Sequence, residues 1–145
     1  MKNIKFRAWD KREKRIFNVT EIEFSFNNEI FNEIKEVKLD GKWGKCCGLD
    51  RYGQKECFTW WGEYRDGKDC ELIQFTGLTD DNGKEIFEGD IVDITVDGFP
   101  KLIGSVIWDK LFAGFQIWDG EDEFDIKKNV KVIGNIYENP ELLNS

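Results

Sequence analysis

Short stretches that alternate between apolar and polar positions dominate the beginning of the chain. The segment from Ile4 to Trp9 has this period of two, which is typical of a half-buried strand. The charged residues from Asp10 to Arg15 then predict a turn. The alternation resumes in Ile16–Val19 and in Glu21–Phe26, so we expect an N-terminal antiparallel meander.

The spacing of apolar residues changes between Asn27 and Lys38. The apolar positions there are Ile30, Phe31, Ile34 and Val37. Their spacing of i, i+1, i+4 and i+7 predicts a helix, because it places them on one helical face. Asn27 or Asn28 is the candidate N-cap, and Gly41 is the candidate residue that ends the helix.

The segment from residue 42 to residue 69 has no clear period and is rich in Gly, Trp, Tyr and Cys. We interpret it as an insertion or an elaborate loop. Structureless loops of this length are uncommon in compact domains. We therefore expect a short hairpin inside it, with Cys57–Tyr64 as one arm.

Short strand signals at regular spacing follow Cys70. Asn82-Gly83 predicts a hairpin between Glu71–Thr76 and Lys84–Phe87, because both turn residues tolerate positive φ. Further strands are expected at Ile91–Val96, Leu102–Trp108, Phe112–Trp118 and Val130–Tyr137. Asn139-Pro140 is expected to cap a last helical turn.

Together these elements predict a mainly β fold with one or two short helices. The expected architecture is a meander and helix over about 1–41, an insertion over about 42–69, and a small SH3-like antiparallel barrel over about 70–145. A chain of 145 residues fits a single domain.

The charge balance of the chain disfavours a nucleic-acid backbone as the main ligand. Lys and Arg number 21 against 29 Asp and Glu, which gives a formal net charge of −8. The first fifteen residues differ, since they hold seven Lys and Arg against Asp10 and Glu13. No apolar stretch reaches the length of a membrane span, and the first residues lack the apolar core of a signal peptide. We expect a cytoplasmic protein.

Several common chemistries lack the residues that they need. The chain contains no histidine, which removes Ser-His and Cys-His catalytic pairs and every zinc site with a histidine ligand. It has neither a P-loop nor a dinucleotide fingerprint. The four cysteines, Cys46, Cys47, Cys57 and Cys70, do not have the spacing of a zinc knuckle. We therefore predict no catalytic, cofactor-binding or metal-binding residue.

Carboxylates are concentrated between residues 80 and 90. They are Asp80, Asp81, Glu85, Glu88 and Asp90. An EF-hand loop with Gly83 at position six would place Leu78 and Gly89 at ligand positions, and neither is a ligand. Hydrolysis by a carboxylate pair such as Glu88 and Asp90 stays an alternative, although surface carboxylates near a turn are far commoner.

The six tryptophans and the basic first residues leave open a stacking platform for single-stranded nucleic acid. Trp108 and Trp118, however, lie in expected strands whose opposite faces also carry apolar residues. We therefore favour core or interface packing for these two residues.

Three sequence blocks together resemble the YopX-like family of phage and prophage proteins. They are KFRAWD at Lys5–Asp10, IQFTGLTDDNGKEIFEGDIV at Ile73–Val92, and VIGNIYENPELL at Val132–Leu143. The resemblance implies a small bacterial cytoplasmic protein of phage or prophage origin, with no established activity and no catalytic residues to transfer. Lys42–Asp69 is not part of it.

Within these blocks, Arg7, Trp9 and Asp10 form the polar and aromatic group of greatest interest, and a structural ion pair is its expected role. For the whole chain we expect a non-enzymatic accessory protein that acts by binding. It would form a homo-oligomer and bind a host or phage protein. The tryptophan-rich insertion is the expected contact surface, with Trp43, Trp60 and Trp61 in it.

Overall fold

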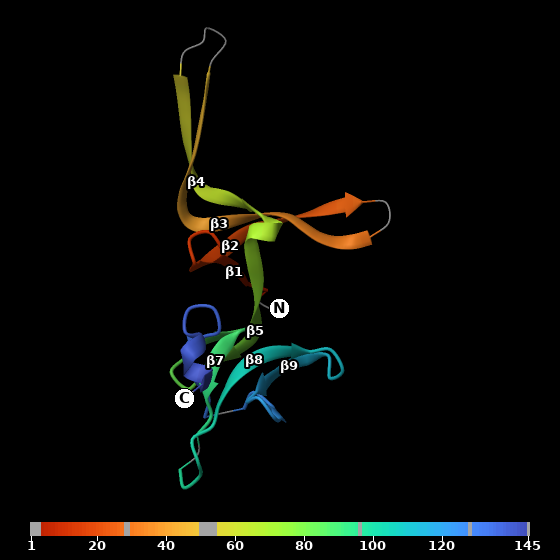
Figure 1. Ribbon diagram of the computed structural model, residues 1–145, viewed down its shortest axis with the longest axis vertical. Helices are drawn as coiled ribbons and strands as arrows, with labels where there is room; N and C mark the ends of the chain where they lie inside the picture. Colours follow the sequence, from red (N-terminus) through yellow and green to blue (C-terminus); the bar gives the residue numbers. More distant parts are fainter. Residues whose placement is uncertain (1–3, 28–29, 50–54, 96, 128, 145) are drawn as a thin grey trace. The chain divides into compact units, whose positions relative to one another are not determined.

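The computed structural model describes residues 4–27, 30–49, 55–95, 97–127 and 129–144 (Figure 1). Within these ranges it describes the side chains of all residues except those in 23–36 and 41–67. The chain divides into two compact units. One comprises Phe6–Leu72, and the other comprises the first residues up to Lys5 together with the chain from Ile73 onward. The expectation of one domain over residues 1–145 stays a prediction.

The unit from Phe6 to Leu72 is built on a meander of long strands. Its elements are β1 (Phe6–Asp10), β2 (Arg15–Asn27), β3 (Ile30–Leu49), β4 (Lys55–Asp66), the 3-10 turn η1 (Gly67–Asp69) and the start of β5 (Cys70–Thr79). The strand order here is β4-β3-β2-β1-β5. The pairs β1–β2, β2–β3 and β3–β4 are antiparallel, which confirms the predicted N-terminal meander.

The predicted helix between Asn27 and Lys38 is wrong, because β3 covers this segment from Ile30 onward. The register explains the misleading spacing. Apolar residues on β2 recur every second residue, and they pair in register as Phe26 with Phe31, Phe24 with Ile34 and Ile22 with Val37. Two register shifts add an extra residue to β3 between these pairs, so its apolar positions fall three apart and imitate a helical period.

The boundary residues of the expected helix also have other roles. Asn27 is the last residue of β2, Gly41 lies inside β3, and Asn28 is outside the described residues.

The described part of the segment from 42 to 69 forms two paired strands, followed by η1, rather than an elaborate loop. The predicted hairpin arm Cys57–Tyr64 is confirmed, since it lies within β4. Pairing with β3 runs without a shift from Trp43 opposite Trp61 to Leu49 opposite Lys55, and Cys47 lies opposite Cys57. The aromatic residues and threonine of this segment favour strands even though their pattern does not alternate.

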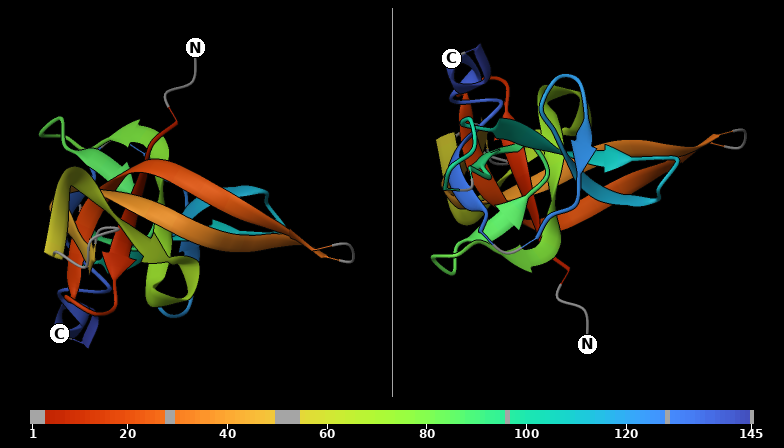
Figure 2. Two further views of the ribbon diagram at one scale, coloured as in Figure 1. Left: turned by 90° about the horizontal axis from the view of Figure 1, so that it is seen from above. Right: turned by 90° about the horizontal axis from the view of Figure 1, so that it is seen from below.

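The second unit contains the end of β5 and the remaining strands. They are β6 (Glu85–Phe87), β7 (Asp90–Asp93), β8 (Ile103–Asp109), β9 (Gly114–Trp118), β10 (Glu123–Phe124) and β11 (Lys131–Asn135), followed by the 3-10 turn η2 (Pro140–Asn144). β5 pairs with β6, and the other five strands form a sheet of order β10-β9-β8-β7-β11. β8 and β9 form a hairpin, coloured teal to blue (Figure 1, Figure 2).

These elements confirm the mainly β class, the strands expected after Cys70 and the final helical turn at Pro140. The five-stranded sheet is antiparallel, as expected, but it does not close into a barrel within the described ranges. Its edge strands are β10, which has two residues, and β11. Pairing of such a short edge strand provides too few hydrogen bonds to close the sheet.

Each unit has its own hydrophobic core. The first core consists of Ala8, Phe17, Val37, Leu39 and Cys70. The second consists of Ile86, Val92, Val106, Ile117 and Val130. Cys70 is a buried thiol of the first core, where cysteine packs as a small apolar side chain. The side chains of the other three cysteines are not among those that the structure describes.

The search for a membrane span found no helix of sufficient length and apolarity in the described part of the chain.

Candidate interaction surface

The carboxylate of Asp80, in the segment rich in carboxylates, accepts hydrogen bonds from backbone N–H groups. Its side chain is 8% exposed. Oδ1 accepts hydrogen bonds from the N–H groups of Asn82 and Lys84, both at 2.9 Å, and Oδ2 accepts one from Val132 N–H at 3.0 Å. Asp80 therefore closes the β5–β6 turn and holds the start of β11.

The pKa of Asp80 lies below its usual range. Burial is the largest single influence and raises this pKa, but the three backbone N–H donors and the charge of Lys84 together lower it more. The carboxylate form is therefore the one that the native structure holds. This is the behaviour of a structural carboxylate.

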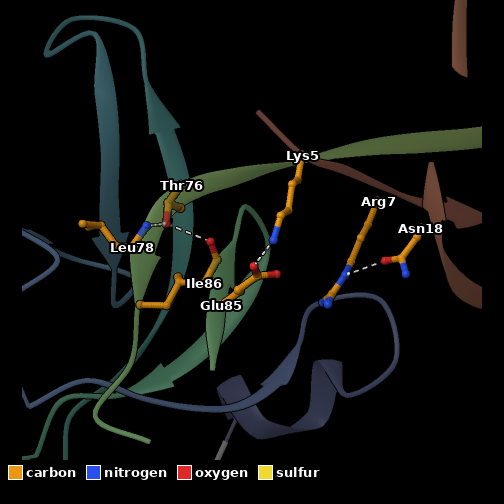
Figure 3. Close-up of polar contacts among 7 residues, drawn as sticks. All are labelled: Lys5, Arg7, Asn18, Thr76, Leu78, Glu85 and Ile86. Atoms are coloured by element: carbon orange, nitrogen blue, oxygen red, sulfur yellow. Dashed lines mark hydrogen bonds and ion pairs between the residues drawn. The ribbon is translucent and has the colours of Figure 1, made fainter. Parts of the chain in front are cut away.

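Asp90 and its neighbours have similar structural roles. The buried Asp90 accepts a hydrogen bond from Phe87 N–H at 2.8 Å through Oδ2. Thr76 Oγ1 donates to the carbonyl of Ile86 at 2.8 Å and accepts from Leu78 N–H at 3.2 Å (Figure 3). The Asp90 carboxylate thus accepts a hydrogen bond from the backbone, which is a structural role. It gives no support to Glu88 and Asp90 as a catalytic pair.

Lys5 binds to the same segment within its own unit. Its ammonium group forms an ion pair with Glu85 (Figure 3) and lies 5.4 Å from the centre of the Phe75 ring. Its backbone carbonyl accepts a hydrogen bond from Phe75 N–H at 2.9 Å.

No group of three or more possible metal ligands occurs among the described residues.

The basic residues near the N-terminus bind within the unit from Phe6 to Leu72. Arg7 Nε donates to Asn18 Oδ1 at 3.4 Å (Figure 3), and the fully buried Asp10 accepts from Arg12 N–H at 3.0 Å. Lys11 pairs with Glu71 at 3.2 Å, and Arg12 pairs with Asp69 at 3.0 Å. Acidic partners within the unit therefore offset much of this positive charge.

Large apolar side chains are exposed at the closed end of the β8–β9 hairpin. Trp108 is 46% exposed, Phe112 is 64% exposed and Leu111 is fully exposed at 100%. We call these three residues the hairpin tip. Trp108 lies opposite Phe115 and contacts it edge to face, with 5.0 Å between ring centres. Phe115 in turn packs against the second hydrophobic core, so it connects Trp108 of the tip to that core.

Asp109 fixes the loop that carries the tip. Its Oδ1 accepts a hydrogen bond from Leu111 N–H at 2.8 Å. This bond and that from Phe112 N–H are among the causes of a lowered Asp109 pKa, and the first is the largest. Ala113 has a φ of 54°, in the left-handed region that closes such hairpins. The apolar residues are therefore held outward by an ordered turn.

The carboxyl groups of Asp109 and Glu123 interact with each other. A hydrogen bond that protonated Glu123 donates to Asp109 is the main cause of a raised Glu123 pKa. Glu123 belongs to β10, which pairs with β9. When Glu123 is protonated, this bond joins the base of the tip to β10.

We predict that Asp109→Asn lowers the pKa of Glu123 toward its ordinary value, since the substitution removes both the hydrogen-bonding carboxylate and its negative charge. The measurement is a ¹³C-detected titration of the Glu123 side chain. Glu138→Gln is the matched control, and it should leave the titration of Glu123 unchanged. An unchanged Glu123 pKa in Asp109→Asn would contradict the assignment of this pair.

The chain that runs from the base of the tip along β9 and β10 is acidic. Residues 109–127 contain two lysines, Lys110 and Lys127, and six carboxylates, which are Asp109, Asp119, Glu121, Asp122, Glu123 and Asp125. Lys127 pairs with Asp125 at 3.8 Å. Asp119 accepts hydrogen bonds from Glu121 and Asp122 N–H, each at 2.8 Å, and these bonds lower its pKa. Glu121 and Asp122 lie exposed on this ordered turn.

The sequence did not identify the tip as a surface. For Trp108 and Trp118 the sequence favours core or interface packing, and their exposure of 46% and 37% shows that neither is buried in the core. Leu111 and Phe112 were missed. The available signal was a pair of large apolar residues within a hairpin turn, where polar residues are usual. The side chains of Trp43, Trp60 and Trp61 lie outside what the structure describes.

Comparisons with known proteins define the family. The crystal structure of protein EF1440 from Enterococcus faecalis is similar to this chain, with a TM-score of 0.64 and 28% sequence identity, and the match covers 99% of each chain. A comparison with curated proteins gave no significant match. The family model described as YopX protein matches residues 5–144. This chain therefore belongs to the YopX protein family.

Proposed function

We propose that this chain is a non-enzymatic accessory protein of a phage or prophage, which acts in the bacterial cytoplasm by binding another protein. The observation that carries the proposal is the hairpin tip. Leu111 is fully exposed although it stands on an ordered turn, and large aromatic side chains flank it. Tryptophan and phenylalanine are enriched in protein interfaces, where their burial provides much of the binding free energy.

The proposal includes self-association, which the unit from Phe6 to Leu72 supports. From Trp43 to Leu49, β3 pairs with β4 alone, and β4 is an edge strand. No third strand covers this part of the ribbon in the described ranges. An isolated two-stranded ribbon is marginally stable in water, so a second copy that covers it would stabilise it.

The two alternatives receive less support from the described residues. For nucleic-acid binding, Lys11 and Arg12 already pair with Glu71 and Asp69. For a carboxylate-based hydrolase, the interacting carboxyl groups of Asp109 and Glu123 lie on β8 and β10 near the protein surface, while catalytic acids are usually enclosed in a cleft.

The test of protein binding compares three baits in extracts of lysogenic or infected cells. We expect the wild-type chain to retain a protein that Leu111→Ser/Phe112→Ser does not retain. Phe99→Ser is the control, because Phe99 is also exposed, at 72%, but lies in another loop. If the same proteins bind to all three baits, or none binds to any, the proposed function is wrong.

Self-association has a separate measurement. We expect light scattering after size exclusion at micromolar concentration to give a mass above the 17.0 kDa of one chain. A mass of one chain across the accessible concentration range would remove self-association from the proposal.

A further inference from the structure

The hairpin tip is apolar, and the chain that runs from it along β9 and β10 is acidic. We call this acidic stretch, residues 109–127, the border, and the combination of the two defines a class of partner. Trp108, Leu111 and Phe112 provide the apolar part. The turn is already fixed by the hydrogen bond from Leu111 N–H to Asp109 and by the left-handed Ala113. Binding would therefore cost little ordering of the loop.

The border has a strong excess of negative charge. Six carboxylates against two lysines in residues 109–127 give a local formal charge of −4. Glu121, Asp122, Glu123 and Asp125 are exposed. An acidic partner would meet repulsion here, whereas a basic partner would be attracted during approach and held at the rim.

The basic stretch of a second copy fits this border poorly. Lys11 and Arg12 form ion pairs at 3.2 and 3.0 Å with acidic residues of their own unit, and Lys11 Nζ also donates to the carbonyl of Lys68 at 3.2 Å. Docking of Lys11 and Arg12 on another copy would exchange these contacts rather than add new ones. The charge complementarity therefore favours a different protein as the occupant.

From these observations we infer that the hairpin tip binds a basic segment of another protein, in which Lys or Arg residues flank one or more large apolar side chains. This inference rests on the proposed function and specifies its partner. The apolar side chains would pack against Leu111 and Phe112, and the basic residues would lie along Glu121, Asp122 and Asp125. The Trp108 ring offers an additional face for a cationic group.

The test uses a displayed library of random peptides of about twelve residues, a length that spans a typical interface patch. Peptides are selected on the wild-type chain and then screened on two double variants. Leu111→Ser/Phe112→Ser removes the apolar centre, and Glu121→Lys/Asp122→Lys reverses the border. The matched control for the charge reversal is Glu138→Lys/Glu141→Lys, since both residues are exposed on another part of the same unit.

We expect peptides that require Leu111 and Phe112 to be enriched in both Lys or Arg and large apolar residues. For these peptides the Glu121→Lys/Asp122→Lys variant should weaken binding about tenfold or more, and salt should weaken binding to the wild type. The control should bind within about threefold of wild type. Circular dichroism should show the same fold for all variants.

Three outcomes would overturn the inference. They are tip-dependent peptides that are neutral or acidic, no tip-dependent peptide at all, and binding that the charge reversal leaves unchanged. The outcome for the proposed function is separate, because it depends on protein captured from cells. Tip-dependent capture that is insensitive to salt and to charge reversal would leave the proposed function standing and reject the basic partner.

Discussion

Asp80→Ala is expected to destabilise the unit that contains β6–β11 by about 3 kcal/mol or more. The substitution removes the acceptor of three backbone N–H groups, from Asn82, Lys84 and Val132. Hydrogen bonds to charged groups each contribute about 1.5–3 kcal/mol, and buried donors that lose their acceptor carry a further cost. The measurement is denaturant unfolding, with hydrogen exchange at the Lys84 and Val132 amides.

The adjacent Asp81→Ala is the matched control. Asp81 is exposed and accepts one hydrogen bond, from Asn129 N–H at 3.0 Å. We expect it to cost about 1 kcal/mol or less. Equal effects of the two substitutions would show that Asp80 does not hold the turn and β11 as the geometry indicates.

The lowered pKa of Asp80 also fixes the pH dependence of this contribution. Because the folded pKa lies below the unfolded pKa, the stabilisation is fully present above the unfolded value of about 4 and is lost as pH falls through the folded value. Wild type should therefore lose stability below about pH 4 more steeply than Asp80→Ala. Parallel pH profiles would contradict this assignment.

The second large effect is expected for Gly104→Ala, at about 3 kcal/mol of destabilisation. Gly104 is buried in β8. A Cβ at this position would lie 2.6 Å from Ile117 Cγ2 and 2.8 Å from the carbonyl oxygen of Trp118. The second neighbour is backbone of the adjacent strand, so relief of the clash would require β8 and β9 to separate.

Gly114→Ala on the opposite strand of the hairpin is the control for this substitution. Its Cβ would meet only the Phe112 ring, at 3.2 Å, and this exposed ring has room to move. We expect a change below about 1 kcal/mol. Thermal unfolding of both variants compares the two sites directly, and a Gly104→Ala protein as stable as Gly114→Ala would refute the close approach of the strands.

The sequence predicted local elements of this fold better than their assembly. Asn82-Gly83 predicted its hairpin correctly because Gly83 adopts a φ of 79°, which few other residues tolerate. The strands after Cys70 could be predicted because Gly, Asn, Asp and Pro residues mark the connections between them. Closure into a barrel depends on pairing between distant strands, and no local pattern specifies it.

The helix predicted between Asn27 and Lys38 is wrong for a related reason, since strand pairing again decides the structure. An extra residue in β3 changes the spacing of apolar positions, and only the partner strand shows that a bulge is present. The hairpin tip was missed for a different reason. A single sequence shows that Leu111 and Phe112 are apolar, but their exposure depends on the turn that Asp109 holds.

The connection between the two units has a consequence for how the family can vary. The chain leaves one unit after Lys5 and re-enters it at Ile73, and Phe75 N–H is hydrogen-bonded to the Lys5 carbonyl at 2.9 Å. The sixty-seven residues from Phe6 to Leu72 are thus inserted between two neighbouring positions of the other unit. Such an insert can change in length at the turns between its strands without moving the two points at which the chain leaves and re-enters the other unit.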